Sequence, residues 1–230
     1  MIICDANLFR IAYAAVSTEE TRYYLNGVFI EPHHAQGVTM TATNGHVFLT
    51  IHDKTGSMGG LSPVIVKIPP KLLKECKPTS KRYDTRHRSM TVETNGLVTV
   101  YDANRTTDDY SLTPSTEVGR FAGALIDGTF PDYRRVIPVV KERGTEDTYS
   151  AKYIAMFADV AMQLSDSDYA PMSISSPGIG SPAIVNFDKN DHAFGVIMPI
   201  RRASDVIMPD WYLQQEPEAE AVAEVEAEAA

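Results

Sequence analysis

One arrangement of predicted elements occurs three times along the 230 residues, and it limits the possible folds more than any other feature. Each copy has a short apolar strand, then a helix with one apolar stripe, then three further strands. The copies begin near residues 2, 64 and 147. This repetition predicts an α+β protein built from three similar modules, in a chain long enough for one large or two modest domains.

Local signals support each module. Asp5 is a favourable N-cap for the first helix, and Pro69-Pro70 suits the start of the second, because proline costs little at the first helical position. The pairs Asn44-Gly45 and Asn95-Gly96 are strong hairpin-turn signals. The third helix is predicted over 151–164. The predicted strands are 2–4, 22–31, 37–43 and 46–53 in the first module; 64–68, 90–93, 97–101 and 119–126 in the second; and 147–149, 171–175, 183–187 and 193–199 in the third.

The net charge of −9 is unevenly distributed along the chain. Residues 216–230 contain six glutamates and no basic residue, so the remaining residues carry only −3. Residues 67–88 contain eight basic side chains and two acidic ones, a local charge of +6. This stretch is the one part of the sequence that indicates a phosphate-facing surface. A solvated helix face and loop would explain the same charges.

The remaining composition indicates a cytoplasmic globular protein. Two cysteines, Cys4 and Cys76, make no disulfide framework and favour a reducing compartment. No stretch approaches the roughly 20 apolar residues of a membrane helix, and residues 1–15 lack the features of a secretory signal. After residue 202 the periodicity ends, and Glu/Ala repeats predict an acidic, disordered tail over 203–230.

Four short stretches carry a more specific signal. They are residues 21–28 (TRYYLNGV), 42–46 (ATNGH), 127–138 (DGTFPDYRRVIP) and 196–201 (VIMPIR). In this order they resemble motifs of the bacterial sliding clamp, the β subunit of DNA polymerase III. The resemblance implies the DNA-clamp fold, in which two modules form each domain and the helices line a central hole. Residues 1–138 would then be one complete domain resembling the family's middle one, and residues 139–202 half of its last domain.

The resemblance also implies a groove that binds short peptides of polymerases and other partners. Apolar side chains suit such pockets, methionine adapts to varied ligands, and a few polar groups orient the peptide. Val47 stands where the family commonly has arginine, so one polar contact is expected to be missing. The groove residues implied here are Leu25, Thr43, Gly45, His46, Phe48, Pro131, Arg135, Val136, Val196, Met198 and Pro199.

Double-stranded DNA is the second implied partner. A clamp needs exchangeable phosphate contacts that do not depend on base sequence, so scattered lysine and arginine on the inner helices suffice. The expected contacts are Arg10, Lys71, Lys74, Lys77 and Lys152.

The sequence predicts no catalytic activity, no metal site and no cofactor. The histidines at 33, 34, 46 and 52 lack metal-site spacing, and adjacent histidines on a strand point apart. No set of base, nucleophile and oxyanion donors is recognisable. The sequence predicts a non-catalytic processivity clamp that also serves DNA polymerase and clamp-loader subunits. The alternative is a clamp-derived interaction module that binds such peptides, or competes with a full-length clamp, without encircling DNA.

The two functions differ in whether several copies of the chain assemble into a closed ring. The family's ring contains twelve modules and this chain supplies three, so a homo-tetramer is the expected closed form, with a dimer joined through the third module as the fallback. The apolar residues 206–213 are expected either to cover the groove or to pack on the third module.

Overall fold

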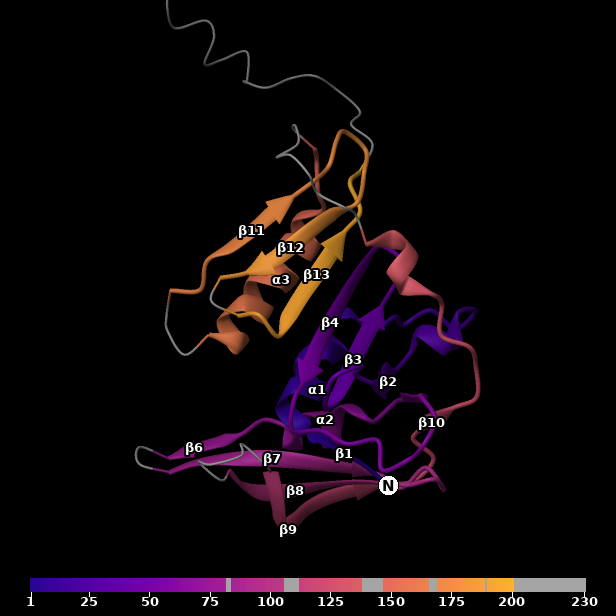
Figure 1. Cartoon of the computed structure of the whole chain (residues 1–230), viewed down its shortest axis with the longest axis vertical. Coiled ribbons are helices and arrows are strands. Elements are labelled where there is room, and N and C mark those ends of the chain that lie inside the picture. Colours follow the sequence, from indigo (N-terminus) through magenta and orange to yellow (C-terminus); the bar gives the residue numbers. More distant parts are fainter. Residues whose placement is uncertain (82–83, 106–111, 138–146, 166–168, 189, 201–230) are drawn as a thin grey trace, which may run out of the picture. The chain divides into compact units, whose positions relative to one another are not determined.

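The three predicted modules are present in the computed structural model, which describes residues 1–81, 84–105, 112–137, 147–165, 169–188 and 190–200 (Figure 1). The first module comprises β1 (Ile2–Asp5), α1 (Ala6–Ala12), the 3-10 turns η1 (Tyr13–Ala15) and η2 (Tyr23–Leu25), β2 (Val28–Pro32), β3 (Val38–Thr43) and β4 (Val47–Asp53). The second comprises β5 (Val64–Val66), α2 (Pro70–Glu75), β6 (Thr79–Lys81), β7 (Asp84–Val92), β8 (Val98–Arg105), β9 (Leu112–Phe121) and β10 (Leu125–Ile126). After η3 (Tyr133–Val136), the third comprises α3 (Ala151–Leu164), β11 (Met172–Ser175), β12 (Ala183–Phe187) and β13 (Ala193–Ile197).

Asp5 determines where the first helix begins. Its Oδ1 accepts hydrogen bonds from the backbone N–H groups of Asn7 at 2.7 Å and Leu8 at 3.0 Å, which satisfies donors of the first turn. The N–H of Asp5 itself donates to Asp53 Oδ2 at 2.7 Å. The start of α1 is therefore attached to the far end of β4.

The first two modules exchange their first strands. β1 of the first module pairs antiparallel with β7 of the second, and β5 of the second pairs antiparallel with β2 of the first. The result is a small sheet in the order β1-β7-β8-β9, with β6 on β7, and a large sheet in the order β10-β5-β2-β3-β4-β13-β12-β11. Because each sheet contains strands from both modules, these two modules fold together.

The third module joins the large sheet through β13, which pairs antiparallel with β4. In this register Val196 lies opposite Phe48, and the N–H of His52 donates to the carbonyl of His192 at 2.8 Å. The strands of the third module lie beside those of the first in Figure 1. Residues almost 150 positions apart in the sequence therefore become neighbours.

The main core lies between the sheets and the helices. α1 contacts β3 and β4 of the large sheet and β7 of the small one, and Phe9 and Ile11 are fully buried there. In the third module Phe157 of α3 packs over Gly195 of β13, where an added Cβ would lie 2.3 Å from the ring. Gly195 therefore allows α3 to approach the sheet closely.

Several strand predictions were wrong in extent. Residues 23–25 form a 3-10 turn where a strand was expected, and β7 begins at Asp84, six residues before the predicted strand. The start of β7 is rich in polar residues, and Arg88 is buried against Asp102 of β8, so an apolar pattern could not reveal it. The predicted strand at 147–149 is reduced to one bridge between Thr148 and Ile200.

Two predictions concern residues outside those described. The expected domain boundary at residue 138 and the acidic tail at 203–230 both fall there, together with residues 206–213. They remain predictions. Within the described part of the chain, no helix is long and apolar enough to cross a membrane.

Candidate functional site

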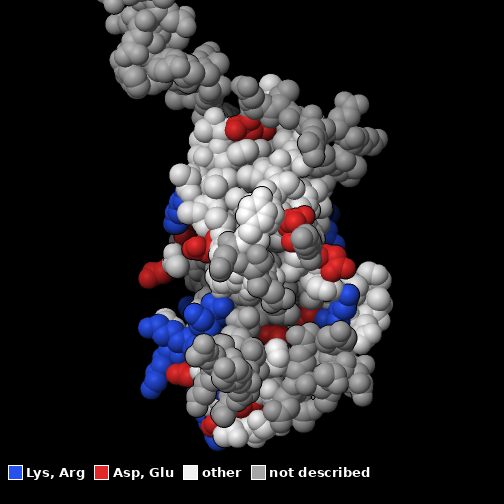
Figure 2. Space-filling view, turned by 90° about the vertical axis from the view of Figure 1, so that its left-hand side faces the viewer, with Lys and Arg blue, Asp and Glu red and all other residues white. Residues whose placement is uncertain are grey.

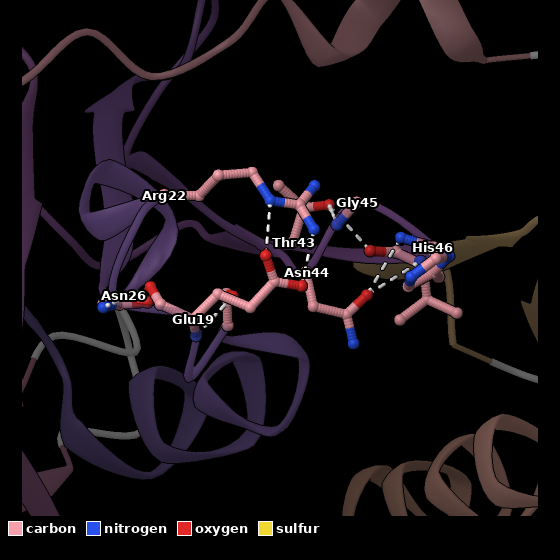
Figure 3. A network of polar contacts seen from close by, with 9 residues as sticks. Glu19, Arg22, Asn26, Thr43, Asn44, Gly45 and His46 are labelled. Carbon is pink, nitrogen blue, oxygen red and sulfur yellow. Dashed lines mark hydrogen bonds and ion pairs between the residues drawn. The ribbon is translucent and has the colours of Figure 1, made fainter.

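The hairpin turn between β3 and β4 is held by its own side chains (Figure 3). The hydroxyl of Thr43 donates to the carbonyl of Val47 at 2.8 Å and accepts from the N–H of Gly45 at 3.1 Å. Asn44 Oδ1 accepts from the N–H groups of His46 at 3.0 Å and Val47 at 3.2 Å. The turn thus has one defined shape, and it presents Gly45 and His46 at the surface.

A paired arginine lies against this turn. Arg22 donates to both carboxylate oxygens of Glu19, at 2.8 and 2.6 Å, and this hydrogen-bonded contact raises the pKa of Arg22 and lowers that of Glu19. Gly45 has φ +88°, and a Cβ there would stand 2.5 Å from Nη1 of Arg22. Figure 3 shows the guanidinium beside the turn. Only glycine fits this position without displacing the arginine.

Beside the turn, a second apolar cluster lies apart from the main core. It contains Leu25, Phe48 and Val196, which are at most 3 % exposed, together with Ile65, Phe130 and Tyr133. The Phe48 ring meets Tyr133 edge-on at 5.5 Å between centroids and Phe194 at 5.9 Å. Edge-to-face aromatic pairs of this kind stabilise a cluster beyond the area they bury.

The segment around η3 is fixed over this cluster by Glu31. The Tyr133 hydroxyl donates to Glu31 Oε1 at 2.8 Å, and Arg134 donates to the same oxygen at 2.7 Å. Burial is the main reason that the pKa of Tyr133 is raised, so the hydroxyl keeps its proton. The neighbouring Val136 stays 44 % exposed.

The end of β13 completes the surface. The N–H of Met198 donates to the carbonyl of His46 at 3.0 Å, which places the methionine beside the β3–β4 turn with 39 % of its surface exposed. The eleven predicted groove residues thus occupy three kinds of position. Leu25, Phe48 and Val196 lie beneath the surface; Thr43, Gly45 and His46 form the turn; and Pro131, Arg135, Val136, Met198 and Pro199 are exposed or half-buried in the segments that border the cluster.

The predicted basic contacts are only partly brought together. Arg10 of α1 and Lys74 and Lys77 of the α2 region line one hollow of about 330 Å³, to which α3 contributes Gln163. Lys71 and Lys152 are exposed on α2 and α3 but do not line it. Basic side chains gather along one side of the molecule in Figure 2 (left). Among the other basic residues of the 67–88 stretch, Arg82 lies outside the described residues.

Comparison with known proteins shows what this chain is similar to. No protein-family model matches the chain. The "Beta sliding clamp" of Caulobacter vibrioides is 32% identical over 132 residues, which cover 54% of this chain and 30% of that protein. The predicted resemblance is confirmed by this match.

The chain is a relative of the bacterial β sliding clamp.

Solved structures agree with this relationship. A sliding clamp (DNA polymerase III subunit beta) from Bartonella birtlesii superposes with a TM-score of 0.57 at 22% identity, over 87% of this chain and 65% of that one. The Caulobacter crescentus pol III beta structure gives a TM-score of 0.56 at 21% identity, over 87% and 66% of the two chains. These likenesses establish the clamp fold. The chain spans less than two thirds of the length of the solved clamps that it matches.

Two residues at the candidate surface of this clamp relative were not predicted. Tyr153, in the first turn of α3, has its ring 6.1 Å from that of His46, and Arg22 lies against Gly45. Arg22 belongs to the recognised stretch 21–28, so the sequence did contain a signal for it. Tyr153 has no local signal, because only the β4–β13 pairing brings α3 next to the turn.

The cysteines and the histidines are the remaining residues with reactive or metal-binding side chains. Both cysteines are buried, and burial raises the pKa of Cys76 to about 12 and also raises that of Cys4, so neither is a thiolate at neutral pH. Within the described ranges, no three His, Cys, Asp or Glu side chains are placed to hold a metal ion.

Replacing Gly45 by alanine is expected to lower the free energy of unfolding by about 1–3 kcal/mol, since the left-handed backbone is strained for alanine and Arg22 must move. Gly178→Ala is the matched control, because an added Cβ there meets no described atom within 4 Å. Urea denaturation of both variants measures the difference. Equal stability of the two would show that Arg22 and the turn are not coupled.

Proposed function

We propose that this protein is a DNA sliding clamp, a processivity factor that tethers replication proteins to DNA through a peptide-binding groove and catalyses no reaction itself. One observation carries the proposal. The pairing of β4 with β13 adds the segment near residue 197 to an apolar cluster that already contains residues near 25, 48 and 133, beside the turn at residue 46. The named relatives are themselves β sliding clamps.

The chemistry of this surface suits a short peptide with an apolar side chain. Phe48 and Val196 form an apolar floor, and the exposed Val136 and Met198 border it. Methionine can adapt its shape to different ligand side chains. The half-buried Arg22 and the exposed His46 at the β3–β4 turn supply polar side chains that can orient a peptide. The expected ligands are short motifs of DNA polymerase and clamp-loader subunits.

The helices supply a surface that suits duplex DNA. Arg10, Lys74 and Lys77 meet in one hollow, and Lys71 and Lys152 are exposed on α2 and α3. These side chains come from different helices and include no base-reading constellation. They suit contacts with phosphates of any sequence, which a sliding protein must make and break repeatedly.

An interaction module that binds clamp-binding peptides without encircling DNA is the second candidate. It is favoured by one observation, that among the described residues the third module has no partner module of the kind that the first two provide for each other. The two functions share the groove and differ in whether several copies close into a ring. A tetramer remains the expected closed form, because four copies supply twelve modules.

Met198→Ala is expected to weaken binding of a Gln-Leu-rich clamp-binding peptide roughly five- to tenfold, because an exposed apolar side chain that contacts the peptide beside the floor is truncated. Ile179→Ala is the control, since Ile179 is 77 % exposed in the β11–β12 turn. Fluorescence anisotropy of the labelled peptide measures both affinities. Unchanged binding by the Met198 variant would remove this surface as the groove.

Replacing Lys71, Lys74 and Lys77 with glutamate is expected to weaken binding to all duplex sequences alike. The salt dependence, log K against log [salt], should flatten by about 0.9 for each phosphate that the protein no longer neutralises. Lys54→Glu, at an exposed turn after β4, is compared with Lys74→Glu as a matched single change. An unchanged slope in the triple variant would mean that α2 is only a solvated surface.

Retention of the protein on circular duplex DNA, before and after the circle is cut, separates the two candidate functions. A closed ring is retained on circular duplex DNA and lost after the circle is cut. An interaction module is lost from circular and linear DNA alike.

A further inference from the structure

The first strand of each complete module has the same two neighbours. β1 bridges the segment that follows its own module's last strand, at Ile3 and Ser57, and pairs on its other side with β7 of the second module. β5 likewise pairs with β10, which follows β9, and on its other side with β2 of the first module. One neighbour therefore belongs to the same module, and the other is the first strand longer than three residues after the helix of the partner module.

The third module has only the first of these neighbours. Thr148 bridges Ile200, which follows β13, and the N–H of Ile200 donates to the Thr148 carbonyl at 2.7 Å. No strand lies on the other side of residues 147–149 among the described residues. β11, the strand that follows α3, is one of the two outermost strands of the large sheet as described. In the described part of the chain, this module therefore has a strand segment, unpaired on one side, that it could give to a partner and an open strand edge that could receive one.

Among the described residues, the backbone of β11 has donors at this edge that no strand accepts. The N–H of Asp188 donates to the carbonyl of Pro171 at 2.9 Å, and the register continues with Met172 opposite Phe187. Backbone groups alternate in direction along an antiparallel strand. The N–H groups of Met172 and Ile174 therefore point away from β12, toward the open edge.

α3 presents a second apolar face at the same module. Its core face is formed by Phe157, Val160 and Ala161. A second stripe along the helix is exposed and contains only apolar side chains, which follow one another at intervals of four, three and four residues. Met162, its largest side chain, is 47 % exposed. This exposed stripe consists of Ala151, Ala155, Ala158 and Met162.

The direction of this stripe follows from Gln163. That residue lines the hollow shared with α1, so its side of α3 faces the first module. Ala158 is five positions earlier, about 140° away around the helix axis. The four stripe residues lie about 80–140° around the axis from Gln163, on the side opposite to the core residues Phe157, Val160 and Ala161. The exposed stripe therefore points away from the core of its own module and not into the hollow. Small side chains allow another helix to approach it closely.

We propose that two copies of this chain pair through their third modules by the strand exchange that already joins the first two. Residues 147–149 of each copy add to β11 of the other, and the two α3 stripes face each other. A second copy fits better than another protein, because one chain supplies both the unpaired strand and the open edge. A two-fold axis satisfies both at once. This interface rests on the fold alone and not on peptide or DNA binding.

Light scattering of the full chain, with Ala158→Glu and Gln163→Glu, tests the interface. Both changes place a glutamate on the exposed surface of α3, but only the first lies in the stripe. The wild-type protein and Gln163→Glu should have the mass of a dimer or an even multiple of the chain. Ala158→Glu should halve that mass.

Hydrogen–deuterium exchange adds a readout at the strand edge. The amides of Met172 and Ile174 should be protected in the wild type and exchange faster in Ala158→Glu, while amides of the β4–β13 pairing stay protected. Met162→Lys replaces Ala158→Glu if circular dichroism shows that the latter has unfolded. Peptide affinity should be unchanged in either variant, which separates a failure of this interface from a failure of the groove.

Three results would overturn the proposal. The first is a wild-type monomer with exchanging β11 amides. The second is a monomer in which those amides are protected, since another strand, such as one from residues 201–230, would then cover the edge. The third is an oligomer whose mass is unchanged by both stripe variants.

Discussion

The pairing of β4 with β13 is the interaction on which the candidate site depends. It places Val196 opposite Phe48 and Met198 beside His46, although these pairs are far apart in the sequence. It also brings α3, with Tyr153, next to the β3–β4 turn. Without this pairing the first module would keep its turn and part of its apolar cluster, but the cluster would lose Val196 and its methionine border.

Local chemistry determines the shape of each half of the site before the halves meet. Thr43 and Asn44 hold the turn through side-chain hydrogen bonds, and Gly45 leaves room for Arg22. On the other side of the cluster, Glu31 anchors η3 through Tyr133 and Arg134. A surface built on strands and short anchored turns is already shaped before a ligand arrives, which reduces the entropy lost on binding.

The sequence predicted the parts of this structure that have local causes. Asp5 caps α1, Asn44-Gly45 forms the turn, and the three modules follow from periodicity. The four recognised stretches led to the clamp family and named most of the candidate surface. The early part of β7 and the role of Tyr153 could not be predicted, because a buried ion pair across two strands and a ring contact between modules depend on the folded chain. The sequence also predicted a strand at residues 147–149. In the structure this segment makes one bridge, between Thr148 and Ile200, and pairs with no other described strand.

The most direct test of the account is to find where a clamp-binding peptide attaches. A peptide that carries a photoreactive phenylalanine analogue in place of its apolar anchor would be cross-linked to the full chain, and the modified residues identified by mass spectrometry. The account predicts adducts on both sides of the β4–β13 pairing, at residues such as His46, Val136, Tyr153 and Met198. Adducts confined to another surface, with these residues unmodified, would contradict it.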